Sequence, residues 1–155
     1  MTETESLPVK VLIADHNHVN IRILTKYLTR LGLHSETVNN GKEVLEAYQN
    51  DPQSYQCILI KPALPVMSGT ESTRLIREFE REGNLNPCSI VWLVPSMSPS
   101  PPDLVRQYAV TATMKWPMKL TSFTQVLDEV GIPTTLPETT TDGVSLDWEF
   151  CIQID

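Results

Sequence analysis

Short apolar runs rich in β-branched residues recur along this chain, and each is followed by a segment with helical periodicity. Residues 9–14 read VKVLIA, residues 57–60 read CILI and residues 89–94 read SIVWLV. Runs that are apolar throughout are typical of strands buried on both faces of a parallel sheet. Parallel strands need long crossovers, which the helical segments supply. The alternation therefore predicts an α/β fold with helices on both faces of the sheet.

The helical segments have one apolar face each. Between residues 19 and 31 the apolar positions recur at intervals of three and four, and Asn17 is the predicted N-cap. In the third helix, Leu75, Ile76 and Phe79 share the face that we expect to be buried. The charged residues expected outside this face are Arg74, Arg77, Glu78 and Glu80. The predicted helices span 19–31, 41–50, 69–81, 103–108 and 122–130, and the two weaker strands span 34–38 and 111–115.

Composition excludes several classes of function. The 155 residues fit one compact domain. The net charge is -7 and the 12 Lys and Arg residues are scattered along the chain, so no clustered basic face is expected for nucleic acid. No apolar run is long enough to cross a membrane, so we expect a soluble, cytoplasmic protein, or a nuclear one in a eukaryote. The three cysteines are far apart, which fits neither a disulfide framework nor a zinc site and indicates buried thiols.

Four parts are expected along the chain. Residues 1–8 form an N-terminal extension, 9–131 the domain, 132–144 a linker and 145–155 a C-terminal extension. From Leu146 onward apolar and polar residues alternate strictly, which predicts a half-buried strand. This strand can pair on its own domain or add to the sheet edge of a partner, and homodimerisation through it stays open.

Two segments carry a resemblance to a known family. Residues 9–32, VKVLIADHNHVNIRILTKYLTRLG, and residues 55–69, YQCILIKPALPVMSG, resemble receiver domains of two-component signalling, most closely those of hybrid histidine kinases. The PVMSG motif at 65–69 is fairly specific, and Trp116-Pro117 stands where the family has a Lys-Pro pair. The resemblance implies a flavodoxin-like, doubly wound, five-stranded parallel sheet of order 2-1-3-4-5, with any site at the carboxyl ends of the strands.

The resemblance also implies a phosphorylation pocket, and this chain departs from it at every position except Asp15, the one carboxylate of the acidic pair that remains. Receivers place an acceptor aspartate after the third strand, an acidic pair for Mg²⁺ after the first, and a hydroxyl and a lysine on later strands. The matching residues here are Lys61 for the acceptor, Asp15 and His16 for the acidic pair, Val94 for the hydroxyl, Trp116 for the lysine and Thr113 for an aromatic switch. No Asp or Glu lies between Asp51 and Glu71, so no shift of the alignment restores the acceptor.

These departures predict a pseudo-receiver, a protein-protein interaction module without enzymatic activity, metal or cofactor. We expect an ion pair between Asp15 and Lys61 in place of the metal. The partner would be a signalling kinase, a phosphotransfer protein or a transcription regulator. A phosphorylation-competent receiver and a flavodoxin-like binder of a small ligand are the alternatives. The candidate partner surface comprises Tyr108, Trp116, Trp148, Phe150 and Ile152. Trp116 can instead pack over the vacant pocket.

Overall fold

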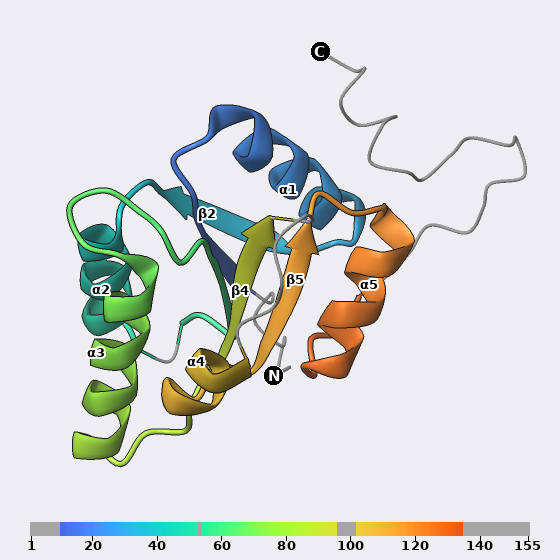
Figure 1. Ribbon diagram of the computed structural model, residues 1–155. Helices are drawn as coiled ribbons and strands as arrows, with labels where there is room; N and C mark the ends of the chain where they lie inside the picture. The colour runs from blue at the N-terminus through green and yellow to red at the C-terminus, as the bar shows by residue number, and fades with distance from the viewer. Residues whose placement is uncertain (1–9, 53, 96–101, 135–155) are drawn as a thin grey trace, which may run out of the picture.

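The computed structural model describes residues 10–52, 54–95 and 102–134, and within them strands and helices alternate as the sequence predicts (Figure 1). No helix in these ranges is long and apolar enough to cross a membrane. The elements are β1 (Lys10–Ala14), α1 (His18–Arg30), β2 (His34–Val38), α2 (Gly41–Asn50), β3 (Cys57–Ile60), α3 (Gly69–Glu82), β4 (Ser89–Pro95), α4 (Pro102–Gln107), β5 (Ala112–Trp116) and α5 (Leu120–Glu129).

All five strands form one parallel sheet of order β2-β1-β3-β4-β5, which confirms the predicted flavodoxin-like topology. The order reverses between β1 and β3, so the loops that follow these two strands diverge at the carboxyl edge of the sheet. This is the edge at which the sequence places its candidate site.

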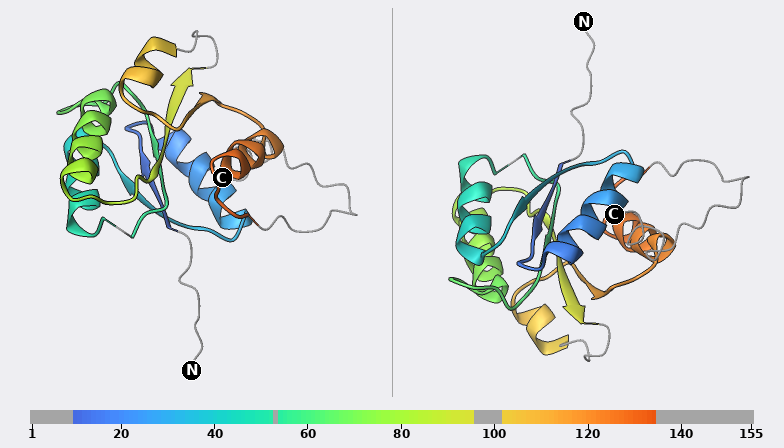
Figure 2. Two further views of the ribbon diagram at one scale, coloured as in Figure 1. Left: turned by 90° about the horizontal axis from the view of Figure 1, so that it is seen from below. Right: turned by 90° about the horizontal axis from the view of Figure 1, so that it is seen from above.

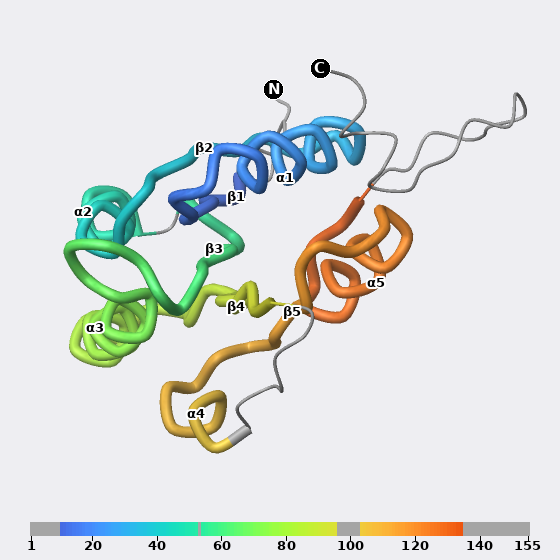
Figure 3. The backbone as a smooth tube through the Cα atoms, turned by 45° about the horizontal axis from the view of Figure 1, so that its top comes forward, coloured from blue at the N-terminus to red at the C-terminus, as the bar shows by residue number. Residues whose placement is uncertain are grey.

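The helices cover both faces of the sheet, as Figures 2 and 3 show: α1 and α5 lie on one side, and α2, α3 and α4 on the other. Alternate residues of each central strand therefore enter different cores. In β1, Val11 and Ile13 face the α1/α5 core, whereas Leu12 and Ala14 face the opposite one. Both faces exclude water along these central strands, which explains why the runs VLIA of β1, CILI of β3 and IVWLV of β4 are apolar throughout.

Polar side chains fix the starts of three helices. Asn17 Oδ1 accepts hydrogen bonds from the backbone N–H groups of Val19 (2.9 Å) and Asn20 (3.2 Å), so the predicted N-cap of α1 is confirmed. Asn40 Oδ1 caps α2 in the same way and Ser68 Oγ caps α3. Each cap satisfies N–H groups that have no partner within the helix, so each also fixes where the preceding loop ends.

The buried face of α3 differs from the predicted one. Arg77 and Glu80, expected on the exposed side, are 8% and 3% exposed, and Leu75 is only partly buried. The periodicity of apolar residues could not identify Arg77 and Glu80 as buried, because they are charged. Their burial is possible because they form an ion pair with each other. The segment 145–155, predicted as a strand, lies outside the described residues, as does most of the predicted linker.

Candidate functional site

A cleft of about 210 Å³ opens at the carboxyl edge of the sheet. Strands β1, β3, β4 and β5 all end at it, and the first turn of α1 forms one wall. The residues that line it are Asp15, Asn20, Lys61, Leu93, Val94, Pro95, Trp116 and Pro117. Four of the six predicted pocket residues therefore meet in one cleft, which sequence spacing alone could not establish.

Asp15 is the one carboxylate among these lining residues, and it is 1% exposed. Its Oδ1 accepts a hydrogen bond from the backbone N–H of Asn17 (2.9 Å), and its Oδ2 accepts one from Asn20 Nδ2 (3.1 Å). His16 Nδ1 lies 3.9 Å from Oδ1, and its side chain is about half exposed. Each carboxylate oxygen therefore accepts a hydrogen bond from a residue at the start of α1.

Lys61 is held in the cleft through its backbone. Its N–H donates to the carbonyl of Ala14 (3.0 Å), which extends the β1–β3 pairing by one residue. The carbonyl of Lys61 lies so close to Gly69 that any Cβ there would clash with it, which explains the glycine of the PVMSG motif. The ion pairs within 4.0 Å in the described residues do not include Lys61 with Asp15.

The expected Asp15–Lys61 ion pair is thus replaced by hydrogen bonds from the chain around Asp15. The physical reason is local. Asn17 and Asn20 follow Asp15 within the same turn, so their donors reach the carboxylate without ordering a long lysine side chain. Sequence reasoning missed Asn20; an amide side chain in the first helical turn after the strand-end aspartate was the signal that could have identified it.

Trp116 closes the cleft from β5. It is 5% exposed, and its ring packs edge-on against Tyr27 (centroids 5.8 Å apart) and Phe123 (6.1 Å). Its indole N–H donates to Asn20 Oδ1 (3.2 Å), so Asn20 connects Trp116 to Asp15. Trp116 was named as part of a partner surface, but it belongs to the core; the other interpretation, packing over the pocket, describes what the structure shows.

The other predicted residues are spread between the cleft and the opposite core. Val94 is buried in the α2/α3 core, and Thr113 pairs in register with Trp92 of β4. The Trp92 ring packs on Tyr108 with centroids 6.0 Å apart, which leaves Tyr108 only partly exposed. The remaining members of the predicted partner surface, Trp148, Phe150 and Ile152, lie outside the described residues.

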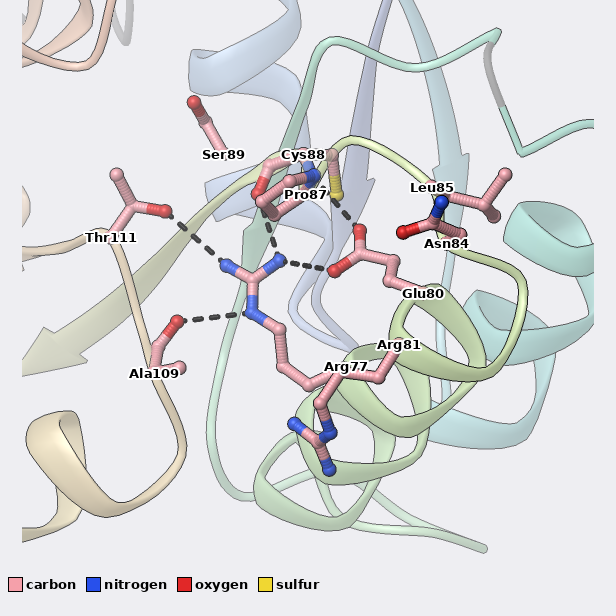
Figure 4. Close-up of a pocket in the computed structure, with 10 residues that line it drawn as sticks. All are labelled: Arg77, Glu80, Arg81, Asn84, Leu85, Pro87, Cys88, Ser89, Ala109 and Thr111. Carbon is pink, nitrogen blue, oxygen red and sulfur yellow. Dashed lines mark hydrogen bonds and ion pairs between the residues drawn. The ribbon is translucent and has the colours of Figure 1, made fainter.

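A larger cavity, of about 670 Å³, lies at the opposite, amino end of the sheet (Figure 4). Arg77 extends from α3 along its wall and donates to the carbonyl oxygens of Ala109 (3.0 Å) and Cys88 (3.0 Å). Its Nη1 also forms an ion pair with Glu80 Oε1 at 2.8 Å. This buried cation therefore joins α3 to the chain before β4 and to the loop before β5, and sequence analysis gave no sign of it.

Glu80 completes the network with its second oxygen, which accepts from Tyr48 Oη (2.7 Å) and from the backbone N–H of Cys88 (2.9 Å). Burial, followed by the hydrogen bond to Glu80, raises the pKa of Tyr48 above its ordinary value. Burial is also the largest cause that raises the pKa of the Cys88 thiol, to about 12. Both side chains are consequently neutral at physiological pH, and Cys88 is a poor nucleophile.

Among the described residues, no cluster of three or more His, Cys, Asp or Glu side chains has the arrangement of a metal site. A doubly wound parallel sheet of this order with a cleft at the carboxyl ends of its strands places the protein in the class of flavodoxin-like α/β proteins. The family model of the response regulator receiver domain matches residues 11–94, more than half of the chain. The chain belongs to this family, whose members are signalling modules of two-component systems.

The segments that this chain matches in its curated relatives are small parts of much longer proteins. The chain is 38% identical over 78 residues to hybrid signal transduction histidine kinase K of Dictyostelium discoideum, which covers 50% of this chain and 6% of that protein. It is 29% identical over 119 residues to the peroxide stress-activated histidine kinase mak3 of Schizosaccharomyces pombe, covering 76% of this chain and 5% of that protein. The chain thus spans only a small part of these relatives.

Solved receiver structures have the same fold. In the co-crystal structure of Saccharomyces cerevisiae Ypd1 with the receiver domain of Ssk1, a matching chain superposes with a TM-score of 0.72 at 24% identity, covering 82% of this chain and 92% of that one. The Mg²⁺-complexed receiver domain of histidine kinase CKI1 from Arabidopsis thaliana superposes with a TM-score of 0.65 at 22% identity, covering 79% and 91%. At these identities the likeness concerns the fold.

Proposed function

We propose that this receiver domain accepts no phosphoryl group and acts as a phosphorylation-independent interaction module in signalling. The observation that supports the proposal is the position of Lys61, which directly follows β3 and lines the cleft with Asp15. An acyl phosphate forms only on a carboxylate, and Mg²⁺ requires several oxygen ligands. A cation beside a single, already hydrogen-bonded carboxylate meets neither requirement.

The same cleft is built to stay in one state. Asn20 donates to Asp15 and accepts from Trp116, so one amide connects β1, α1 and β5 across the cleft. Trp116 is in turn fixed by Tyr27, whose hydroxyl donates to the Met118 carbonyl (2.7 Å). A switch needs two arrangements of comparable free energy, whereas this packed and hydrogen-bonded set favours one.

The exposed apolar residues near the carboxyl edge of the sheet support a role in protein binding. Val19 in the first turn of α1 is 58% exposed and Val66 in the β3–α3 loop is 79% exposed. Val66 has a φ of 69°, which is unusual for a β-branched residue, and the flanking Met67 N–H donates to the Pro65 carbonyl (2.7 Å). A backbone conformation that costs free energy holds an apolar side chain in solvent, which favours a contact with a partner.

The Ssk1 receiver was crystallised with the histidine phosphotransfer protein Ypd1. This supports a phosphotransfer protein as the class of partner that we assign here, ahead of a signalling kinase or a transcription regulator. An inert receiver that occupies a phosphotransfer protein would act as an adaptor or as a competitor of active receivers.

The phosphorylation test compares the native chain with Lys61→Asp in acetyl phosphate and MgCl₂. We expect no hydroxylamine-sensitive adduct on the native chain, by intact-mass spectrometry, and no Mg²⁺ binding in a calorimetric titration. Lys61→Asp is expected to bind Mg²⁺, because it places a second carboxylate beside Asp15. An adduct on the native chain would contradict the proposal and favour a phosphorylation-competent receiver.

The binding test measures affinity for a histidine phosphotransfer protein with and without phosphodonor. We expect equal affinity in both conditions, and a loss of about tenfold in Val66→Asp, corresponding to roughly 1.4 kcal/mol at one apolar contact. Leu104→Asp is the matched control, because Leu104 is also exposed but lies on α4. Equal losses of affinity in both variants would mean that Val66 is not a specific contact of the partner.

A further inference from the structure

The last described residues of the chain lie beside the large amino-end cavity. After α5 ends, Ile132 is buried, and the Val130 carbonyl accepts a hydrogen bond from Ser89 Oγ (3.1 Å). A second cavity, of about 240 Å³, is lined by this exit segment and by Pro87, Cys88 and Ser89. The large cavity is lined by the same three residues, so the two adjoin. We call the two together the amino-end groove.

The groove is partly apolar and carries one uncompensated charge. Leu85 and Pro87 line the large cavity together with Cys88, whose thiol is neutral. The charge of Arg77 is balanced by Glu80 at 2.8 Å. Arg81, one helical turn beyond Arg77, is exposed on the cavity wall and has no ion pair among those within the described residues. The groove therefore suits an apolar segment that carries negative charge.

The chain beyond the groove has this composition. In the segment 146–155, Leu146, Trp148, Phe150, Ile152 and Ile154 alternate with polar residues, three of which are acidic. Residues 135–145 separate this segment from the exit of the domain, and at about 3.3–3.6 Å per extended residue they span up to roughly 36–40 Å. That length allows the segment to return to the groove in which the chain leaves the domain.

We propose that residues 146–155 dock in extended conformation in the amino-end groove of their own domain, with Trp148 and Phe150 over the large cavity and a carboxylate of the segment near Arg81. A volume of about 670 Å³ is within the range of roughly 300–1,000 Å³ that holds a drug-sized ligand, so it accommodates two aromatic side chains. The inference concerns the opposite end of the sheet from the proposed function and stands independently of it.

Acrylamide quenching of tryptophan fluorescence in the full chain tests this docking. The contribution of Trp148 is obtained as the difference between the native chain and Trp148→Phe, because Trp92 and Trp116 are buried in the core. We expect Trp148 to be shielded in the native monomer. In Leu85→Glu we expect the docking equilibrium to fall by about tenfold, the change that corresponds to loss of one aliphatic contact. Arg81→Glu is also expected to weaken docking, and the loss should be larger at low salt than at high salt, because salt screens the interaction between charges.

Lys42→Glu is the matched control, since Lys42 is an exposed cation on α2 that does not line the groove. Shielding lost in Leu85→Glu and Arg81→Glu but kept in Lys42→Glu, in a monomer by light scattering, supports the proposal. Full quenching of Trp148 in the native chain overturns it. Shielding that survives both groove substitutions overturns the proposal and indicates that the segment pairs with a sheet edge instead. Shielding that appears only when the chain dimerises at higher concentration overturns it too and indicates docking on a second copy.

Discussion

Glu80→Ala is expected to lower the free energy of unfolding by about 3–5 kcal/mol, the usual cost of removing one partner of a buried ion pair. The substitution leaves the Arg77 guanidinium buried without its carboxylate and removes the acceptor of both Tyr48 Oη and the Cys88 N–H. Because these groups belong to α2, α3 and the chain before β4, the loss affects three elements at once. Urea unfolding followed by circular dichroism measures it.

Glu78→Ala is the matched control on the same helix. Glu78 pairs with Arg74 at 2.7 Å, but both side chains are more than 40% exposed. Solvent screens such a pair, so we expect a change within about 0.5 kcal/mol. If both variants lost similar stability, the buried Arg77–Glu80 network would contribute no more to stability than a surface pair, which would contradict the prediction.

Trp116→Ala is expected to lower the free energy of unfolding by about 3–5 kcal/mol, the range for removing a large aromatic side chain from a core. The substitution removes the ring contacts with Tyr27 and Phe123 and leaves Asn20 Oδ1 without its donor. Thermal unfolding of the variant beside the native chain measures the effect.

Trp116→Phe keeps most of the ring contacts and loses only the indole donor, so a smaller loss of stability is expected from it, on the order of 1–3 kcal/mol. The opposite pattern, a loss of partner binding in Trp116→Ala with stability unchanged within about 0.5 kcal/mol, would mean that Trp116 is a surface anchor after all. These outcomes separate a role in the core from a role in recognition.

Glu80→Ala and Trp116→Ala concern opposite ends of one sheet, and at each end side-chain hydrogen bonds hold neighbouring elements together. At the carboxyl edge, Asn20 connects Asp15 to Trp116; at the amino edge, Arg77 connects α3 to the loop before β5. The first link consists of hydrogen bonds made by an amide, and in the second the charge of Arg77 is paired with Glu80. Such fixed links are what the proposed phosphorylation-independent function requires.

How far the sequence predicted the site depended on whether the signal was local. Lys61 and Asp15 could be placed in one cleft because each follows a strand whose neighbours were predictable from apolar runs and the resemblance to receivers. The ion pair expected between them is absent from the ion pairs of the described residues, because side-chain contacts do not follow from strand order. Which donor reaches a carboxylate depends on side-chain positions, and the backbone of Asn17 was closer than the lysine ammonium.

The sequence by itself determined the order of strands and helices, the N-cap of α1 and the lack of any Asp or Glu between Asp51 and Glu71, because each of these follows from residue types at short range. Only the tertiary structure decided that Trp116 is in the core, that Arg77 and Glu80 are buried together, and that the chain leaves the domain beside a cavity. A charged or aromatic side chain is compatible with either burial or exposure. The choice depends on partners that are distant in the sequence and that only the folded chain brings within reach.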